Sequence, residues 1–218
     1  AHLMALQSAK LVVLPDLSGI ISSVNNNILI NCFCQIAKKE NIHLIATGVT
    51  DSNKGIYKTA YLFYPDGNFK YYYQVHLEES ESKVFTPGNR LVVWETEIGR
   101  IGIMLGYEGF LPEVPRCLTL MGADIIAWPI NFTSHYYQLV SRTRASENRI
   151  YTLVVNTCGS NGSMVINPFG TIQVASFQDH EQAIGTQIEI SLARNKNIVP
   201  GSNVIKDRIP SAYKELCI

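Results

Sequence analysis

The sequence predicts an α/β fold: two mixed β-sheets packed face to face, with helices on the outside. Strand-like apolar runs alternate with helical patterns and are followed by strand pairs joined by tight turns, an order typical of layered α/β folds. The chain has 218 residues, of which 46% are hydrophobic and 17% charged, so it can bury a sizeable core. We expect residues 1–218 to form a single domain.

Before residue 100 the pattern predicts the end of a helix at residues 1–9 and then one amphipathic helix among short strands. Ser22 or Ser23 can cap this helix, which runs to about Glu40. Asp16 follows the first strand at its C-terminal end, where ligands bind in open α/β sheets. The motif Pro65-Asp66-Gly67-Asn68 indicates a hairpin. The expected strands are 11–14, 42–49, 59–64, 69–73 and 91–96.

The stretch 97–115 predicts a strand, a sharp turn and a helix. The apolar run 101–105 is followed by Gly106, and Pro112 stands near the helix start, where its missing N–H costs nothing. A side chain on such a turn is lifted out of the sheet, beside N–H groups that favour an anion. The turn suits a nucleophile, but Gly106 has no side chain. The later expected elements are a helix at 136–151 and strands at 125–129, 152–156, 163–167, 171–176 and 183–190.

Composition argues against several classes of protein. Lys+Arg and Asp+Glu both number 18, so no basic excess indicates nucleic-acid binding. No apolar run approaches the ~18 residues of a membrane helix, and the N-terminus does not read as a signal peptide. Five scattered cysteines argue against a disulfide framework and favour a reducing, cytoplasmic location. Cys32 and Cys34 lie two apart on an expected helix and point to different faces, so they chelate poorly and we expect no metal site. We also expect no cofactor.

Seven short motifs, in order along nearly the whole chain, are similar to those of one enzyme family. Around the turn, Tyr107-Glu108 is followed by Pro112, Glu113 and Arg116. The other six are Leu14-Pro15-Asp16-Leu17, Tyr72-Tyr73-Gln74-Val75-His76-Leu77, 81–88, Gly122-Ala123-Asp124, Arg144-Ala145-Ser146-Glu147-Asn148 and Asn167-Pro168-Phe169-Gly170. Together they resemble the nitrilase family of carbon–nitrogen hydrolases. The resemblance implies an α-β-β-α sandwich whose first strand is missing here. We therefore expect a piece of a longer chain, with a possible further domain before Ala1.

Members of this family attack a nitrile or amide carbon with a cysteine thiolate, a glutamate base and a lysine. The matching positions here hold Gly106, Asp16 and Gln74, so all three differ. Asp16 is shorter than glutamate by roughly 1–1.5 Å, and a misplacement of about 1 Å can cost ~100-fold in rate. Gln74 carries no charge. Loss of the nucleophile costs on the order of 10⁶ in rate.

The resemblance therefore implies a catalytically degenerate domain with a binding, regulatory or scaffolding role. One alternative is a carbon–nitrogen hydrolase with a rewired active site, in which Cys158 is the best replacement nucleophile; a purely structural dimerising module is another. Ser18 reads more simply as a loop residue, and His76 as a structural histidine. Glu81 could line the site or be solvated, and Glu147 could instead form a helix-surface pair with Arg144.

The expected binding residues are Asp16, Gln74, Glu81, Tyr107, Glu108, Asn131 and Glu147. Their carboxylates should converge near Gly106 without a cation and raise one another's pKa values. Such a site would bind a small polar ligand of the amine type, and Gln74→Lys would stabilise the fold. The resemblance also implies a homodimer formed through helices 112–121 and 136–150.

Overall fold

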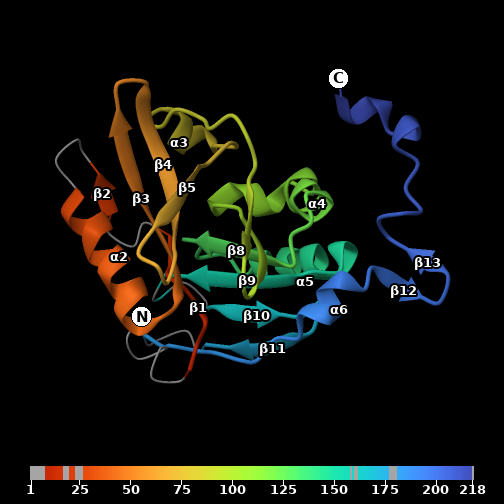
Figure 1. The fold of residues 1–218 in the computed structure, drawn as a ribbon. Helices are drawn as coiled ribbons and strands as arrows, with labels where there is room; N and C mark the ends of the chain where they lie inside the picture. Colours follow the sequence, from red (N-terminus) through yellow and green to blue (C-terminus); the bar gives the residue numbers. More distant parts are fainter. Residues whose placement is uncertain are drawn as a thin grey trace.

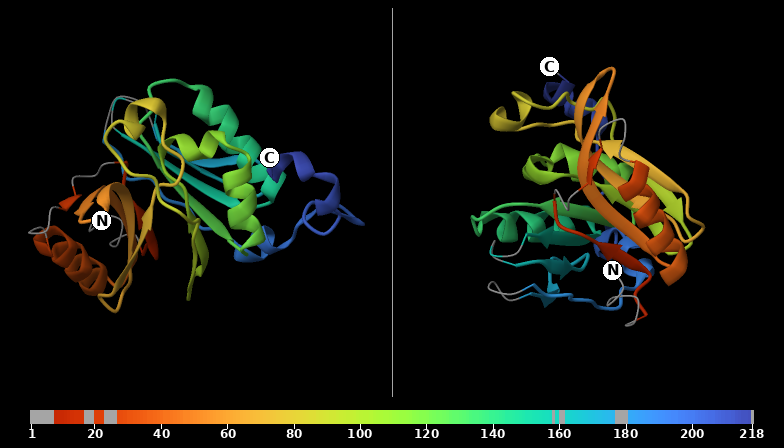
Figure 2. Two further views of the ribbon diagram at one scale, coloured as in Figure 1. Left: turned by 90° about the horizontal axis from the view of Figure 1, so that it is seen from above. Right: turned by 90° about the vertical axis from the view of Figure 1, so that its left-hand side faces the viewer.

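Two β-sheets packed face to face form the body of the molecule (Figures 1 and 2). The computed structural model describes residues 8–16, 20–22, 27–157, 159, 162–176 and 181–217. The first sheet has the order β1-β3-β4-β5, and β2 pairs with the later half of β3. Its strands are β1 (Leu11–Val13), β2 (Ile20–Ser22), β3 (His43–Ser52), β4 (Gly55–Phe63) and β5 (Phe69–Tyr73).

The second sheet has the order β11-β10-β9-β8-β7-β6. Its strands are β6 (Val93–Thr96), β7 (Gly99–Ile103), β8 (Ile125–Ile130), β9 (Tyr151–Asn156), β10 (Met164–Ile166) and β11 (Ile172–Ala175). The strands β7, β8 and β9 are parallel. Pro129 fits inside β8 because the pairing with β7 ends at Ala127, so the missing N–H of the proline breaks no ladder bond on that side.

Apolar side chains from both sheets fill the space between them. Ile45 and Leu62 of the first sheet pack with Ile101, Ile103 and Ala127 of the second, and all five are fully buried. This shared layer is the central core, and it explains why strands of both sheets read as apolar runs.

Helices cover the outer face of each sheet, which confirms the expected α-β-β-α sandwich. The helix α2 (Asn27–Glu40) packs on the first sheet, where Phe33 stacks on Phe63 at 5.5 Å between ring centroids. The helices α4 (Glu113–Leu120) and α5 (Tyr136–Asn148) pack on the second sheet. None of the helices in the described ranges is long and apolar enough to span a bilayer.

Several expected element boundaries were wrong. Ile20–Ser22 forms strand β2 rather than a helix start, and the described helix begins at Asn27; Ser23 lies outside the described residues. The strands β3 and β4 extend to a tight turn at Asn53-Lys54, so β4 begins at Gly55 instead of residue 59. A short helix, α3 (Glu79–Ser82), lies in the expected polar loop.

The expected strand 183–190 is also wrong. Residues 181–189 form no regular strand, and the helix α6 (Ile190–Arg194) follows them. Ile188, Ile190 and Leu192 pack against Ile125 and Tyr151, so tertiary packing outweighs the strand-like pattern.

The chain then leaves the sandwich as an arm carrying β12 (Asn197–Val199) and β13 (Ser202–Asn203), which ends in single helical turns (Figure 1).

Candidate functional site

Trp128 of β8 fixes the turn that follows β7. Gly106 has φ +45°, in the left-handed region that favours glycine, and opens the 3₁₀ turn Gly106–Phe110. The indole Nε1 of Trp128 donates to the carbonyl of Gly106 at 2.9 Å. A Cβ on Gly109 would lie 2.0 Å from the Trp128 ring, so only glycine fits there. The strand–turn–helix expected from the sequence is present, with its turn held by the neighbouring strand.

Glu108 ties this turn to the end of β5. Its carboxylate is fully buried and accepts hydrogen bonds from the Tyr72 hydroxyl at 2.5 Å and the Leu105 N–H at 2.8 Å. The N–H groups of Val75 and His76 donate to it at 2.8 and 3.2 Å. Burial, with the charge of Glu108, raises the pKa of Tyr72 far above its ordinary range. With four donors around it, Glu108 holds the two sheets together and does not offer a free carboxylate.

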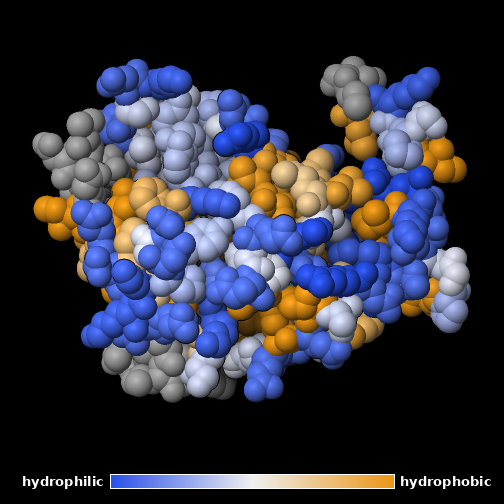
Figure 3. Space-filling model, viewed as in Figure 1, coloured by the Kyte–Doolittle hydropathy of each residue, from blue (hydrophilic) through white to orange (hydrophobic). Residues whose placement is uncertain are grey.

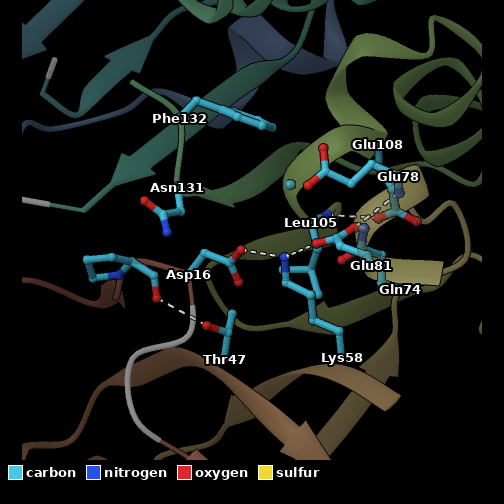
Figure 4. A network of polar contacts seen from close by, with 12 residues as sticks. Asp16, Thr47, Lys58, Gln74, Glu78, Glu81, Leu105, Glu108, Asn131 and Phe132 are labelled. Atoms are coloured by element: carbon cyan, nitrogen blue, oxygen red, sulfur yellow. Dashed lines mark hydrogen bonds and ion pairs between the residues drawn. The ribbon is translucent and has the colours of Figure 1, made fainter. Parts of the chain in front are cut away.

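Lys58 places an ammonium between two carboxylates beside the turn (Figure 4). Its Nζ lies 2.6 Å from Asp16 Oδ2 and 2.6 Å from Glu81 Oε1. The side chains of Lys58 and Asp16 are only 5% and 2% exposed, and that of Glu81 is 14% exposed. Burial opposes the charge of Lys58, but the attraction and hydrogen bonds of Asp16 and Glu81 outweigh it, so the pKa of Lys58 is raised.

Gln74 completes this cluster without adding charge. Its Nε2 donates to Glu81 Oε2 at 2.9 Å and to the His76 carbonyl at 2.8 Å. Its Oε1 is buried and has no hydrogen-bond partner among the described residues. On the other side, Thr47 Oγ1 donates to the Pro15 carbonyl at 3.1 Å and holds the segment that carries Asp16.

The cluster faces Gly106. A Cβ at this position would lie 3.3 Å from Lys58 Nζ, and 3.8 Å from both Gln74 Nε2 and Glu81 Oε1. The structure therefore brings together Asp16, Gln74, Glu81 and Gly106, as the sequence predicts. The expectation of crowded carboxylates without a cation is wrong, because Lys58 lies among them.

Glu147 belongs to a different set of contacts. Its carboxylate pairs with Arg144 Nη1 at 3.0 Å and receives a bond from Asn148 Nδ2. Arg144 in turn donates to the carbonyls of Gly109 and Phe110, so this pair joins α5 to the outer side of the turn. The helix pair considered as the alternative for Glu147 is what the structure shows.

The remaining candidates lie at the edge of the cluster or elsewhere. Asn131 directly follows β8, and its side-chain oxygen accepts a hydrogen bond from Thr157 Oγ1 at 2.7 Å. Tyr107 is 37% exposed and contacts the Phe110 ring instead of the ammonium. His76 lies 3.6 Å from Glu108, and this interaction raises the pKa of His76.

The two candidate replacement nucleophiles stay predictions. Cys158 and Ser18 lie outside the described residues. The cysteines whose side chains are described, Cys32, Cys34 and Cys117, lie on the outer helices α2 and α4. In the described part of the chain, no three acidic, histidine or cysteine side chains are grouped to hold a metal ion.

Sequence reasoning missed Lys58, although a signal was present. Side chains alternate between faces along a strand, so Lys58 shares the face of Ala60 and Leu62, which point into the central core. A lysine on the buried face of a strand requires an anionic partner. The sequence pattern places the start of this strand at residue 59, which leaves Lys58 just outside it.

A family model described as carbon–nitrogen hydrolase matches residues 2–196. The chain belongs to this family. It is 26% identical to a nitrilase of Pyrococcus abyssi over 228 residues, which covers 95% of this chain and 87% of that protein. It is 30% identical over 174 residues to a probable nitrilase of Schizosaccharomyces pombe, covering 74% of this chain but only 63% of that protein.

Solved structures of the family share the architecture. A carbon–nitrogen hydrolase from Helicobacter pylori superimposes with a TM-score of 0.86 at 20% identity, over 99% of this chain and 89% of that one. At this identity the likeness shows the fold alone.

Proposed function

We propose that this protein is a catalytically degenerate carbon–nitrogen hydrolase that serves as a binding, regulatory or scaffolding domain. The observation that carries the proposal is Gly106, on the turn beside Lys58, Asp16 and Glu81. Covalent catalysis needs a nucleophile at this place, and glycine supplies none. The charged groups around it remain organised, which favours a site that still binds a small polar ligand.

Lys58 does not replace the nucleophile. Only an uncharged amine can attack a carbonyl carbon, and the two carboxylates raise the pKa of Lys58. Its ammonium therefore stays charged at neutral pH. Lys58 can stabilise negative charge or donate a hydrogen bond, which are functions of a binding site as much as of an active site.

A second candidate is a hydrolase that uses water directly. It is favoured by the contact of Asp16 with Lys58 beside Gly106, which keeps a carboxylate base and a cation together. Water would lose a proton to Asp16 and attack the amide carbon, Lys58 would stabilise the oxyanion, and the departing amine would take the proton. We rank this candidate second because a proton on Asp16 would weaken its buried ion pair with Lys58.

Incubation with a panel of amides and nitriles separates the two. The protein is assayed for released ammonia or acid, and its intact mass is measured for an acyl adduct. We expect neither product nor adduct. Turnover that disappears in Asp16→Asn would establish the second candidate, whereas an acyl adduct would show that another nucleophile operates and would overturn both.

We also propose that the chain forms a homodimer through α4 and α5. Support comes from the large apolar side chains that these helices leave exposed: Leu120 and Met121 are 43% and 49% exposed, and Tyr136 and Leu139 are 61% and 62% exposed. In Figure 3 orange apolar surface gathers in the region of α4. A face of this kind is commonly covered by a partner.

A further inference from the structure

We propose that Lys58 determines the ligand specificity of this site. Its ammonium occupies the place between Asp16 and Glu81 that a cationic ligand would take, so amines are excluded. The ligand is instead a small uncharged molecule with an oxygen that accepts a hydrogen bond from Lys58. The inference rests on the proposed binding function and reverses the preference expected from the carboxylates alone.

The exclusion of amines follows from the contacts of the carboxylates. Asp16 Oδ2 and Glu81 Oε1 both lie 2.6 Å from Lys58 Nζ, and Glu81 Oε2 accepts from Gln74 and the Glu78 N–H. A second ammonium close enough to use the same oxygens would lie beside the first. Like charges in a poorly hydrated place repel strongly. The ammonium of Lys58 therefore already occupies the site that a ligand cation would need.

The preference for an oxygen acceptor follows from the donors that face Gly106. An ammonium has three N–H bonds, and Asp16 and Glu81 receive two of them. The ideal Cβ position of Gly106 is 3.3 Å from Lys58 Nζ, so the ammonium faces the space over this glycine. A ligand oxygen in van der Waals contact with the Gly106 Cα can accept the third N–H there. Because residue 106 is glycine, it places no side chain of its own in that space.

The test removes the lysine ammonium from between Asp16 and Glu81 and supplies a free ammonium ion from solution. Lys58→Ala removes the atoms of one propylammonium ion, so we expect n-propylammonium to bind this variant and to stabilise it. At about ten times its dissociation constant it should raise Tm by about 3–6 °C. Propan-1-ol, which has the same shape without charge, should give no such rise in the variant. The wild type should respond to propylammonium chloride no more than to sodium chloride.

A second variant keeps the test informative if Lys58→Ala does not fold. Asp16→Asn with Lys58→Ala removes one carboxylate together with the cation and leaves Glu81 as the single anion. We expect propylammonium to stabilise the double variant too, with a smaller shift at the same concentration. No rise in Tm in the variant that folds, or an equal rise in the wild type, would overturn the assignment.

The second part of the proposal, that the ligand presents an oxygen acceptor to Lys58, is tested with acetamide as the probe. Backbone amide signals of Gly106 and Tyr107 should shift in the wild type and remain unchanged in Lys58→Met. Equal shifts in both proteins, or none in the wild type, would refute Lys58 as the anchor. Ammonia released during the titration would contradict the proposed non-catalytic function alone, so the two failures are distinguishable.

Discussion

Replacing Lys58 by methionine should destabilise the fold strongly. Methionine preserves most of the side-chain volume but leaves the Asp16 and Glu81 carboxylates without their cation. Removal of one partner from a buried ion pair costs about 3–5 kcal/mol. The Asp16 side chain is only 2% exposed, which supports the full range, whereas Glu81 at 14% exposure can regain some hydration. We therefore expect a loss of about 3–4 kcal/mol in the free energy of unfolding.

Urea unfolding at pH 7, followed by circular dichroism, measures this loss as a lower midpoint at unchanged slope. The matched control is Asp16→Asn with Lys58→Met, which removes the charges of Lys58 and Asp16, leaves only that of Glu81, and should recover part of the stability. Lys58→Arg should cost less than Lys58→Met because it retains the charge. A loss below about 1 kcal/mol for Lys58→Met would refute the reasoning, since that is the range of a solvent-exposed pair.

The same ion pair predicts an alkaline dependence. The pKa of Lys58 is higher in the folded protein than the ordinary value of about 10.4 in an unfolded chain. Its contribution to stability is therefore fully present below that ordinary value and is lost as the pH rises through the folded value. The stability difference between wild type and Lys58→Met should stay constant from pH 7 to 9 and shrink above pH ~10.4. A difference that shrinks on acidification alone would contradict this assignment.

Three further perturbations test other parts of the site and the assembly. Gln74→Lys should destabilise the protein by about 1–3 kcal/mol in urea unfolding, because it removes the two hydrogen bonds that the Gln74 amide donates and adds a second ammonium near Lys58. A gain in stability would contradict this. Glu108→Gln should lower the free energy of unfolding by about 1–3 kcal/mol, since the new amide group turns an N–H toward backbone donors. Unchanged stability would show that Glu108 does not hold the two sheets together. Light scattering at micromolar concentration should give the mass of a dimer, and Leu139→Glu should shift it toward the monomer; a wild-type monomer would exclude the proposed interface.

The architecture was largely predictable because local patterns and long-range packing agree. The apolar run before Gly106 forms β7, and its turn lies where the strand–turn–helix pattern places it. The strand predicted at residues 183–190 is wrong because Ile188 and Ile190 pack on Ile125 and Tyr151 without joining a sheet. Periodicity reports that a side chain is buried but not always which element buries it.

The site was only partly predictable, since its charge balance depends on residues that are distant in sequence. Asp16, Gln74 and Glu81 were found because each lies in a short motif. Lys58 lies in no such motif, and its two partners are 42 and 23 residues away. Glu147 lies in a motif, yet its carboxylate turns to Arg144 on the same helix. A motif fixes a position on the backbone, whereas the partner of a charged side chain depends on the fold.

Glycine at 106 and lysine at 58 are best understood as one arrangement. A side chain at 106 would require a left-handed backbone conformation at φ +45°, which disfavours residues other than glycine. It would also place a Cβ 3.3 Å from the ammonium, so Lys58 would have to move while still bound to two carboxylates. The backbone and the ion pair therefore both oppose a side chain at this turn. A cysteine restored at position 106 alone would therefore have to adopt this left-handed conformation and displace the ammonium by a few tenths of an ångström.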